Sequence, residues 1–402
     1  MSEPEPIVRT AARGDGITQG GRHVPFAAPG DLVWPDGRLE FGPHHQQPPC
    51  RHFGTCGGCQ LQHLDEEVLA AFVHDRVVHA AASQGLEPGI VAAVHLSPPG
   101  SRRRATLHAV NGGGRPIVGF REGGSHRAID LRECHVLRPE LFALVEPLRR
   151  MIAGRRGKYA LSIELALADQ GVTCALTGLE LEGLDQTEAL LDFCRDRQLA
   201  RMVLDQGFGA EAFWEPEPVT VTLSGVAVPF PAGSFLQATC DGEQALVGAA
   251  RDWLAGAGRT ADLFSGLGTF AFALADRGPV VAVEASRDAH LACRLAAARS
   301  GSRVEAVHRD LFRNPLTSEE LRDFDAVVLD PPRAGAREQV AQIARSGVGR
   351  VAYISCNPSS WARDAAVLKE AGYRLSELRP VGQFRWSTHV ELASLFRRDA
   401  PG

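Results

Sequence analysis

The sequence is short of positive charge, of lysine and of long apolar runs, and each shortage limits what the chain can do. Its 402 residues carry 43 Lys and Arg against 48 Asp and Glu, a formal net charge of -5. Such a chain has no overall attraction to nucleic acid, so any RNA or DNA contact must come from local patches. Lys158 and Lys369 are the only lysines. Arginine would therefore supply such patches, although a GC-rich genome explains the same bias.

No apolar run reaches the length of a membrane-spanning helix, so we expect no membrane contact. The first residues, MSEPEPIVRT, lack the basic and apolar pattern of a secretory signal peptide. We therefore expect a cytoplasmic protein. In that reducing compartment, nine cysteines indicate metal binding or catalysis before disulfides.

The pattern of the sequence changes twice, which predicts three domains. Short alternating strands punctuated by glycine fill residues 7–41 and predict a small β-barrel, followed by a polar linker at 42–49. An amphipathic helix within 65–85 is expected to pack on the last domain, and strand-like segments then dominate as far as residue 235. After residue 238 strands and helices alternate, as in a doubly wound parallel sheet. The predicted domains are 1–45, 46–235 and 236–402.

A glycine turn in ADLFSGLGTFAFALA predicts a nucleoside-binding site. Gly266 and Gly268 lie between a predicted strand and a predicted helix, where glycine lets the backbone approach a ligand. The next strand ends in Glu284, whose carboxylate could accept hydrogen bonds from ribose hydroxyls. The turn lacks both the phosphate cradle and the three-glycine dinucleotide motif, so an adenosine cofactor without a pyrophosphate fits better. Asp310, after a further strand, either holds the adenine amino group or caps a helix.

Two further strand ends carry reactive side chains. Asp330 ends DAVVLD and precedes two prolines and Arg333, while Cys356 ends VAYISC. In a doubly wound sheet these strands lie side by side, about 4.8 Å apart, so that their ends share a pocket with the glycine turn. The thiol is either a nucleophile or a small buried hydrophobe. Glu391 in THVELASLF either faces solvent or lies at the site as a buried carboxyl suited to proton transfer.

Four cysteines have a spacing typical of a metal site. Cys50, Cys56 and Cys59 form C-x5-C-x2-C, and Cys134 is a remote fourth. Structural zinc usually has two C-x2-C pairs, so this set favours an iron-sulfur cluster, with zinc as the alternative. The remaining unpaired cysteines are interpreted as core or incidental: Cys174, Cys194, Cys240 and Cys293.

Two groups of positively charged or titratable residues have less specific patterns. Adjacent His44 and His45 share no ligand spacing with the cysteines, so we interpret them as solvated linker residues and not as metal ligands. Arginines gather in the central domain and are either phosphate contacts or a solvated β-face. They are Arg102, Arg103, Arg104, Arg115, Arg121, Arg127 and Arg132.

Four motifs in order, DLFSGLGTF, DPPR, SCNP and HVE, resemble those of the S-adenosylmethionine-dependent RNA uridine C5-methyltransferases. The similarity runs from the cysteine set to the C-terminal glutamate. It implies a class I methyltransferase sheet at the C-terminus and a shortened TRAM-like (OB-type) barrel at the N-terminus. The strand-like segments between them predict a mostly antiparallel central domain. The similarity also implies a structural [4Fe-4S] cluster on the four cysteines. RNA cytosine C5 enzymes, by contrast, have a catalytic cysteine where this chain has Pro332.

The resemblance also implies residue roles. Cys356 would be the nucleophile and Glu391 the base. The cofactor and target site would be lined by Gln237, Phe264, Gly266, Gly268, Glu284, Asp310 and Asp330. Thr239 and Thr269 depart from the family's pattern, which often has asparagine there, and this puts a hydrogen bond near the cofactor in doubt.

These features predict an RNA uridine C5-methyltransferase with no obligate protein partner. Ribosomal 23S RNA is favoured as the substrate because the cysteine set and the barrel look like those of the ribosomal enzymes, and transfer RNA is the alternative. A candidate from another class is an iron-sulfur RNA-binding assembly factor. The presence of Cys356, Asp330 and Glu391 argues against that second class.

Overall fold

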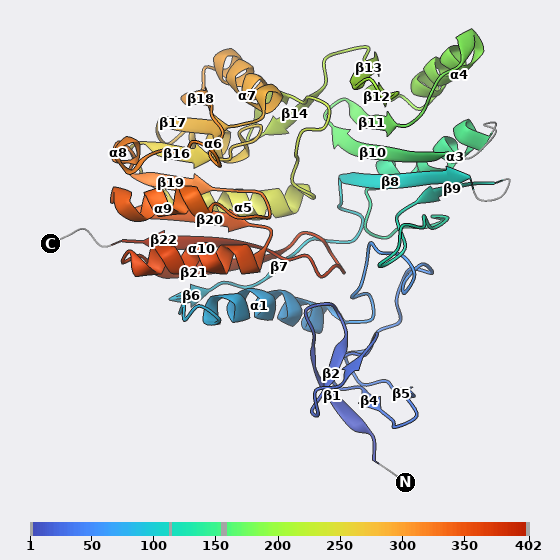
Figure 1. Cartoon of the computed structure of the whole chain (residues 1–402), viewed down its shortest axis with the longest axis horizontal. Coiled ribbons are helices and arrows are strands. Elements are labelled where there is room, and N and C mark those ends of the chain that lie inside the picture. The colour runs from blue at the N-terminus through green and yellow to red at the C-terminus, as the bar shows by residue number, and fades with distance from the viewer. Residues whose placement is uncertain (1–2, 112–114, 154–158, 399–402) are drawn as a thin grey trace. The chain divides into compact units, whose positions relative to one another are not determined.

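The computed structural model describes residues 3–111, 115–153 and 159–398. Its internal contacts divide the chain into two units (Figure 1). Unit 1 consists of Met1–Phe72, Ser97–Pro218 and Phe384–Thr388, and unit 2 of Val73–Leu96, Val219–Gln383 and His389–Gly402. The three-domain division with its boundaries after residues 45 and 235 therefore stays a prediction. Among the described residues, no helix is long and apolar enough to cross a membrane.

Unit 1 begins with a five-stranded antiparallel sheet in the order β3-β2-β1-β4-β5. Its strands are β1 (Glu5–Thr10), β2 (Gly16–Thr18), β3 (His23–Val24), β4 (Leu32–Val33) and β5 (Leu39–Glu40). Ile7, Val24, Ala27 and Val33 form its small core. This half-barrel confirms the predicted TRAM-like module. The linker after it is less solvated than predicted, because the His45 side chain is only 9% exposed and its Nδ1 lies 2.7 Å from Asp31 Oδ2.

A second sheet in unit 1 has the order β13-β12-β11-β10-β8-β9. Its strands are β8 (Arg104–Asn111), β9 (Pro116–Gly119), β10 (Ala160–Ala168), β11 (Gly171–Thr177), β12 (Arg201–Asp205) and β13 (Ala210–Trp214). All neighbours pair antiparallel except β11 and β12. A parallel pair needs a crossover connection, which helix α4 (Gly183–Asp196) supplies. The sheet is therefore largely antiparallel, as expected from the sequence.

Helices of the central region and one of its strands differ from the prediction. Besides α4, the region contains α2 (Pro139–Phe142) and α3 (Val145–Ala153), where the sequence predicted mainly strands. The segment RAIDL is not a strand, although Ile129 and Leu131 donate backbone hydrogen bonds to carbonyls at the neighbouring edge. Its alternation reflects burial along a loop and not sheet pairing. The VTVTLSG segment forms β14 (Thr220–Leu223), which pairs with β15 (Val226–Pro229) in unit 2.

Unit 2 contains a nine-stranded sheet whose main order is β18-β17-β16-β19-β20-β22-β21-β6. Its strands are β16 (Thr260–Leu263), β17 (Val280–Glu284), β18 (Val304–His308), β19 (Ala326–Leu329), β20 (Arg350–Ser355), β21 (Arg374–Gly382), β22 (Glu391–Arg397), β6 (Ile90–Val91) and β7 (His95–Leu96). Strands β16 to β20 are parallel. Every residue of β16 and of β19 is buried, as expected for a parallel sheet covered on both faces. The predicted doubly wound sheet is confirmed.

The strand order reverses between β16 and β19, and one later strand runs the other way. Ligands bind beyond the carboxyl ends of the strands at such a reversal. Strand β22 lies between β20 and β21 and is antiparallel to both, so it begins at the edge where β20 ends. The helices are α1 (Glu66–Ala82), α5 (Cys240–Trp253), α6 (Thr269–Leu274), α7 (Arg287–Ser300), α8 (Ser318–Leu321), α9 (Arg337–Ser346) and α10 (Pro358–Glu370) (Figure 1).

Candidate active site

The backbone of the glycine turn after β16 is left-handed at three positions, a conformation that favours glycine. Phe264, Gly266 and Gly268 have positive φ angles of 64°, 54° and 93°. A Cβ on Gly268 would lie 2.8 Å from the Phe272 ring and 2.9 Å from Cys293 Sγ, so only glycine fits there. Helix α6 begins directly after it, at Thr269.

Glu284 is held against this turn by backbone donors. Its Oε2 accepts the Gly266 N–H at 2.9 Å, and its Oε1 accepts the Ser286 N–H at 2.6 Å. Each carboxylate oxygen has a second lone pair, so the group can still accept hydrogen bonds from a ligand. Its place at the end of β17, beside the turn, suits the ribose contact that the sequence predicted.

Asp310 supports an aromatic wall near the turn. Its Oδ1 accepts the N–H groups of Phe312 at 2.9 Å and of Arg313 at 3.3 Å. The residues directly after it, 311–314, form turns and not a helix, so Asp310 caps a turn and not the helix that was one of its two predicted roles. That turn presents Phe312, whose ring centroid lies 5.3 Å from that of Phe264. The predicted contact of Asp310 with adenine stays a prediction.

Gln237 and Asp330 meet although they are distant in sequence. Gln237 Nε2 donates to Asp330 Oδ2 at 3.2 Å, directly beyond the end of β19. Gln383, which the sequence did not single out, donates from Nε2 to Gln237 Oε1 at 2.9 Å. Burial and the nearby charges of Glu391 and Asp262 raise the pKa of Asp330 well above its usual value. The donated N–H from Gln237 opposes that rise.

Two antiparallel strands bring Cys356 near Glu391. Strand β20 pairs Ser355 with Leu392 of β22, and Cys356 and Glu391 are the residues next to that pair on the two chain segments. The negative charge of Glu391 acts on the Cys356 thiol, so the two side chains lie near each other. Glu391 is only 4% exposed. The structure therefore decides between the two expectations for Glu391: the carboxyl is buried at the strand end and does not face solvent.

Burial and nearby charges raise the pKa of the Cys356 thiol. Burial, followed by the negative charges of Glu391 and Asp330, raises the pKa of Cys356 to about 11, while Arg333 lowers it. The side chain is half-buried, so it is not the enclosed hydrophobe that was the alternative interpretation. A thiol attack at this position therefore needs removal of the thiol proton as the reaction proceeds.

Hydrogen bonds join the two turns that carry Asp330 and Cys356. Asn357 caps α10 by accepting the Ser359 N–H at 3.1 Å, and its Nδ2 donates to the Arg333 carbonyl at 2.9 Å. Behind them Asp364 accepts the Ala336 N–H at 2.7 Å and the Tyr353 hydroxyl at 2.8 Å. These bonds fix the DPPR turn relative to the SCNP turn.

The two threonines that depart from the family's pattern begin helices. The Thr239 hydroxyl oxygen accepts the Gly242 N–H at 3.0 Å and so caps α5. Thr269 is the first residue of α6. Thr239 is fully buried, so its hydroxyl acts on the helix end.

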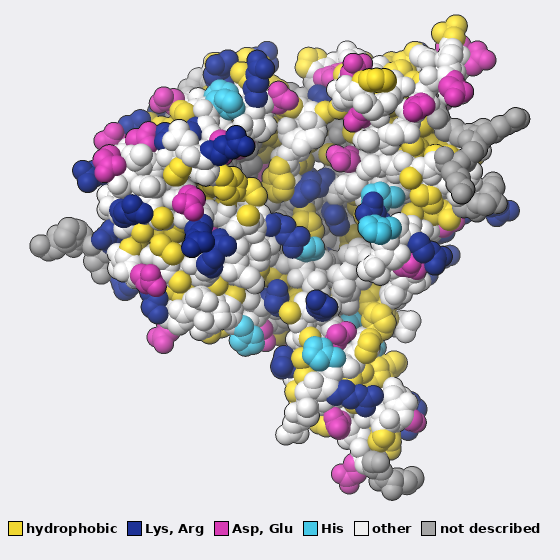
Figure 2. All heavy atoms as spheres, in the orientation of Figure 1, with side chains coloured by type: hydrophobic (Ala, Val, Ile, Leu, Met, Phe, Trp, Pro, Cys, Tyr) yellow, Lys and Arg dark blue, Asp and Glu magenta, His cyan; other side chains and the backbone are white. Residues whose placement is uncertain are grey.

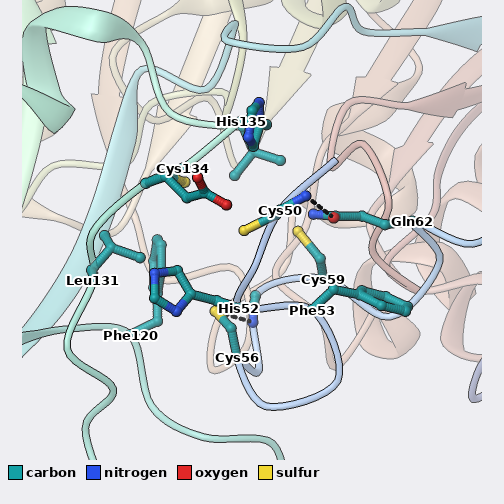
Figure 3. A pocket seen from close by; sticks show the side chains of 13 residues that line it. Cys50, His52, Phe53, Cys56, Cys59, Gln62, Phe120, Leu131, Cys134 and His135 are labelled. Atoms are coloured by element: carbon teal, nitrogen blue, oxygen red, sulfur yellow. Dashed lines mark hydrogen bonds between the residues drawn. The ribbon is translucent and has the colours of Figure 1, made fainter. Parts of the chain in front are cut away.

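The four predicted metal-ligating cysteines line one cavity in unit 1 (Figure 3). Cys50, Cys56 and Cys59 come from one loop, and Cys134 comes from the segment that follows Leu131. Apolar side chains, among them Phe53, complete the wall. None of the nine cysteines, all of which lie within the described ranges, forms a disulfide. Within the described ranges, no group of three or more His, Cys, Asp or Glu side chains is arranged to hold a metal ion.

Backbone contacts tie the two cysteine-bearing segments together. The Gly57 N–H donates to the Arg121 carbonyl at 2.8 Å, and the Arg132 N–H donates to His52 Nε2 at 3.0 Å. The Gly58 N–H donates to Cys56 Sγ at 3.4 Å. Burial raises the pKa of all four thiols, that of Cys59 to about 12. Of the other cysteines, Cys174, Cys194 and Cys293 are buried and Cys240 is exposed, in agreement with core or incidental roles.

The arginines of the central region differ in how exposed they are. Arg103 is buried, and Arg102 lies over the rings of Phe120 and Phe384 at 5.9 and 5.3 Å, so these two are not the exposed contacts that were expected. Arg132 pairs with Asp130 at 2.6 Å. On the face shown in Figure 2, basic side chains are interspersed with acidic ones.

Comparisons with known proteins agree with these features. The family model described as tRNA (Uracil-5-)-methyltransferase matches residues 219–399. An uncharacterized RNA methyltransferase of Zymomonas mobilis is 47% identical over 98% of this chain and 99% of that protein. The 23S rRNA (uracil(1939)-C(5))-methyltransferase RlmD of Pectobacterium atrosepticum is 32% identical over 90% of this chain and 82% of that protein.

A solved structure has the same fold. The tRNA (uracil-54, C5)-methyltransferase of Pyrococcus abyssi, in complex with S-adenosyl-L-homocysteine, is similar with a TM-score of 0.75 at 23% identity, over 98% of this chain and 100% of that one. The doubly wound sheet with its glycine turn and strand-end carboxylate is thus a methyltransferase fold. With relatives above 30% identity along nearly the whole chain, the protein belongs to the RNA (uracil-5-)-methyltransferase family.

Proposed function

We propose that the chain transfers a methyl group from S-adenosylmethionine to carbon 5 of a uridine in RNA, through a covalent bond between Cys356 and carbon 6. The proximity of Cys356, Glu391 and Asp330 beyond the end of β20 carries this proposal. These three side chains lie at the edge of the sheet where the glycine turn begins α6. Nucleophile, base and cofactor site therefore share one edge.

Residues on the cofactor side fit an adenosyl group. The glycine turn leaves backbone space, Glu284 offers acceptor lone pairs for ribose, and the Phe264 and Phe312 rings offer apolar surface. Gln237 and Asp330 would lie between this group and the target base. The cofactor supplies an electrophilic methyl group on a sulfonium.

Covalent catalysis explains why a thiol is needed. Carbon 5 of uridine is a poor nucleophile on its own. The half-buried Cys356 thiol first releases its proton to solvent, and the thiolate then adds to carbon 6 and moves the electron pair of the carbon 5–carbon 6 double bond toward carbon 5 and the carbonyl at carbon 4. Carbon 5 then bonds to the methyl group. Glu391 removes the remaining proton from carbon 5, the double bond re-forms, and the Cys356 thiolate leaves. The target atom is hidden in stacked RNA, so the uridine must be flipped or unstacked to reach this pocket.

Ribosomal RNA is the favoured substrate. The relative RlmD is named for a uridine of 23S rRNA and covers 90% of this chain. The family model, by contrast, is named for tRNA.

Methylation of purified RNA pools decides between these substrates. The RNA comes from a strain that lacks the gene for this protein, and S-adenosylmethionine with a labelled methyl group is supplied. We expect the protein to form labelled 5-methyluridine in the 23S rRNA of that strain and not in its tRNA. Mass spectrometry of nuclease fragments identifies the position. Label in tRNA alone would transfer the proposal to the alternative substrate, and label in neither RNA would end it.

We further propose that Cys50, Cys56, Cys59 and Cys134 hold a [4Fe-4S] cluster. They line one cavity with apolar walls, and a Gly58 N–H points at one sulfur, as hydrogen bonds to cluster sulfurs often do. A zinc ion needs all four sulfurs at about 2.3 Å from one point. In a cluster each thiolate binds its own iron atom, which suits ligands arranged around a cavity. The cluster would join the loop of Cys50 to the segment of Cys134.

Metal analysis tests the cluster directly. Protein purified without oxygen is expected to contain about four iron atoms per chain and to absorb near about 400 nm, with loss of that absorbance on reduction. Cys134→Ser should lose most of the iron, because a ligand is removed. Cys174→Ser, at a buried cysteine outside the cavity, is the matched control and should retain it. Colourless protein with one zinc atom would contradict the proposal.

A further inference from the structure

A line of three hydrogen bonds in unit 2 ends on Asp330. The Ala238 N–H donates to Gln383 Oε1 at 3.1 Å, and Gln383 Nε2 donates to Gln237 Oε1 at 2.9 Å. Gln237 Nε2 then donates to Asp330 Oδ2 at 3.2 Å. Both glutamines are almost fully buried, with 2% exposure for Gln383 and 3% for Gln237.

The direction of this line is fixed at its far end. A backbone N–H can only donate, so Gln383 must turn its oxygen toward Ala238 and its NH₂ group toward Gln237. Gln237 must then accept with its oxygen, which turns its own NH₂ group toward Asp330. Reversal of either amide would oppose oxygen to oxygen inside the protein and leave buried polar groups without a hydrogen bond, which is unfavourable.

Packing also holds Gln383 in place. Gly242, in the first turn of α5, approaches Gln383 so closely that a Cβ on the glycine would lie 2.7 Å from Gln383 Cβ. Gln383 therefore cannot move toward α5, and its side chain is confined to the space beside Gln237. Gln383 directly follows β21, which ends at Gly382.

We propose that Gln383 is a positioning residue, which orients the Gln237 amide so that Asp330 always receives a hydrogen-bond donor. This inference rests on the proposed function only for its effect on methylation. Donation favours the charged form of Asp330, whose carboxylate can then accept the N3–H of the target uridine. The ionisable groups that face Asp330 are Glu391 on β22, Asp262 on β16 and Cys356 beyond β20. All three are acids, so none of them offers a positive charge that would stabilise the Asp330 carboxylate.

Titration of Asp330 tests this positioning role without RNA or cofactor. Carbon-13 NMR of the protein labelled at aspartate carboxyls reports the pH at which Asp330 is half ionised. The Asp330→Asn variant identifies the Asp330 signal, because that signal is absent from its spectrum. Gln383→Met keeps the volume but removes the donor that holds Gln237. We expect it to raise the midpoint by about one pH unit, because the carboxylate loses a fixed donor. Gln237→Met should raise the midpoint at least as much.

A double-mutant cycle and a matched control separate positioning from packing. If Gln383 acts through Gln237, Gln383→Met has no further effect on the midpoint once Gln237→Met is present. Gln339→Met is the control. Gln339 lies in α9, is as buried as Gln383 and forms hydrogen bonds with the backbone of Leu316, so this substitution should leave the Asp330 midpoint unchanged. If Gln383→Met does not fold, Gln383→Leu is measured with the same expectation.

The outcomes distinguish this inference from the proposed function. The positioning role would be overturned if Gln383→Met left the Asp330 midpoint unchanged. It would also be overturned if Gln383→Met shifted the midpoint as much in the Gln237→Met background as in the wild-type protein. In methylation assays the acid side of the pH–rate profile should move to higher pH in the same variant, by the same number of pH units, because Asp330 ionises at higher pH. Wild-type protein that forms no 5-methyluridine would end the proposed function, while the NMR titration would still decide the role of Gln383.

Discussion

Cys356→Ala is expected to lower methyl transfer at least about 10⁴-fold, the largest effect of any single substitution in this chain. Without the thiolate no electron pair reaches carbon 5 of the uridine, so nothing can accept the methyl group. The side chain is half-buried and loses one sulfur atom, so the fold should tolerate the change. Single-turnover transfer of labelled methyl groups to RNA measures the loss.

Cys240→Ala is the matched control for that loss. Cys240 is exposed, at the first residue of α5, and belongs to neither the cavity nor the strand-end site. Its rate should remain within about twofold of the wild-type rate, as for surface substitutions in general. RNA and cofactor binding should persist in Cys356→Ala, which separates lost chemistry from lost folding. Wild-type activity in Cys356→Ala would remove this residue as the nucleophile.

Glu391→Gln is expected to stop the reaction after methyl transfer and to accumulate a covalent protein–RNA adduct. Glutamine has the same shape but cannot take the proton from carbon 5, so the bond between Cys356 and carbon 6 cannot be released. Turnover should fall by about 10²–10⁴-fold, the usual contribution of a general base. Denaturing gels that resolve free protein from the adduct measure both its amount and its decay.

A neighbouring carboxylate provides the control for Glu391→Gln. Glu377 lies on β21 and accepts a hydrogen bond from Trp253 Nε1 at 2.8 Å, away from the strand-end site. Glu377→Gln should turn over without an adduct. The double variant Cys356→Ala with Glu391→Gln should form no adduct at all. Free turnover by Glu391→Gln would exclude Glu391 as the base.

Local sequence was sufficient for the parts of the site that neighbouring residues determine. The glycine turn, the strands ending in Glu284, Asp330 and Cys356, and their parallel arrangement follow from apolar runs, glycines and chain order. Parallel strands joined by helices have their carboxyl ends at one edge, so these side chains were expected together.

The position of Glu391 could not be predicted in the same way. Its neighbours in sequence are apolar on both sides, which suits a solvated or a buried carboxyl equally well. Only the insertion of β22 between β20 and β21, antiparallel to both, brings Glu391 to the end of β20 and close to Cys356. A shift of one residue would have turned the carboxyl to the other face of the sheet.

Gln383 was missed because its role depends on contacts between distant segments. It lies 145 residues from Ala238 in sequence and 146 from Gln237, and no motif marks it. The central region differed from its prediction for a related reason. The RAIDL segment is a loop that donates two backbone N–H groups to the neighbouring chain segment. Its buried and more exposed side chains alternate as they would in a strand, so the sequence pattern does not distinguish the two structures.

The most direct test of the account is the site of attachment in the Glu391→Gln adduct. Digestion with protease and nuclease, followed by mass spectrometry, identifies which peptide carries the nucleotide. The account predicts one modified residue, Cys356, bonded to a uridine that already carries the transferred methyl group. A nucleotide bonded to any other cysteine, or methylated RNA released with no adduct, would contradict it.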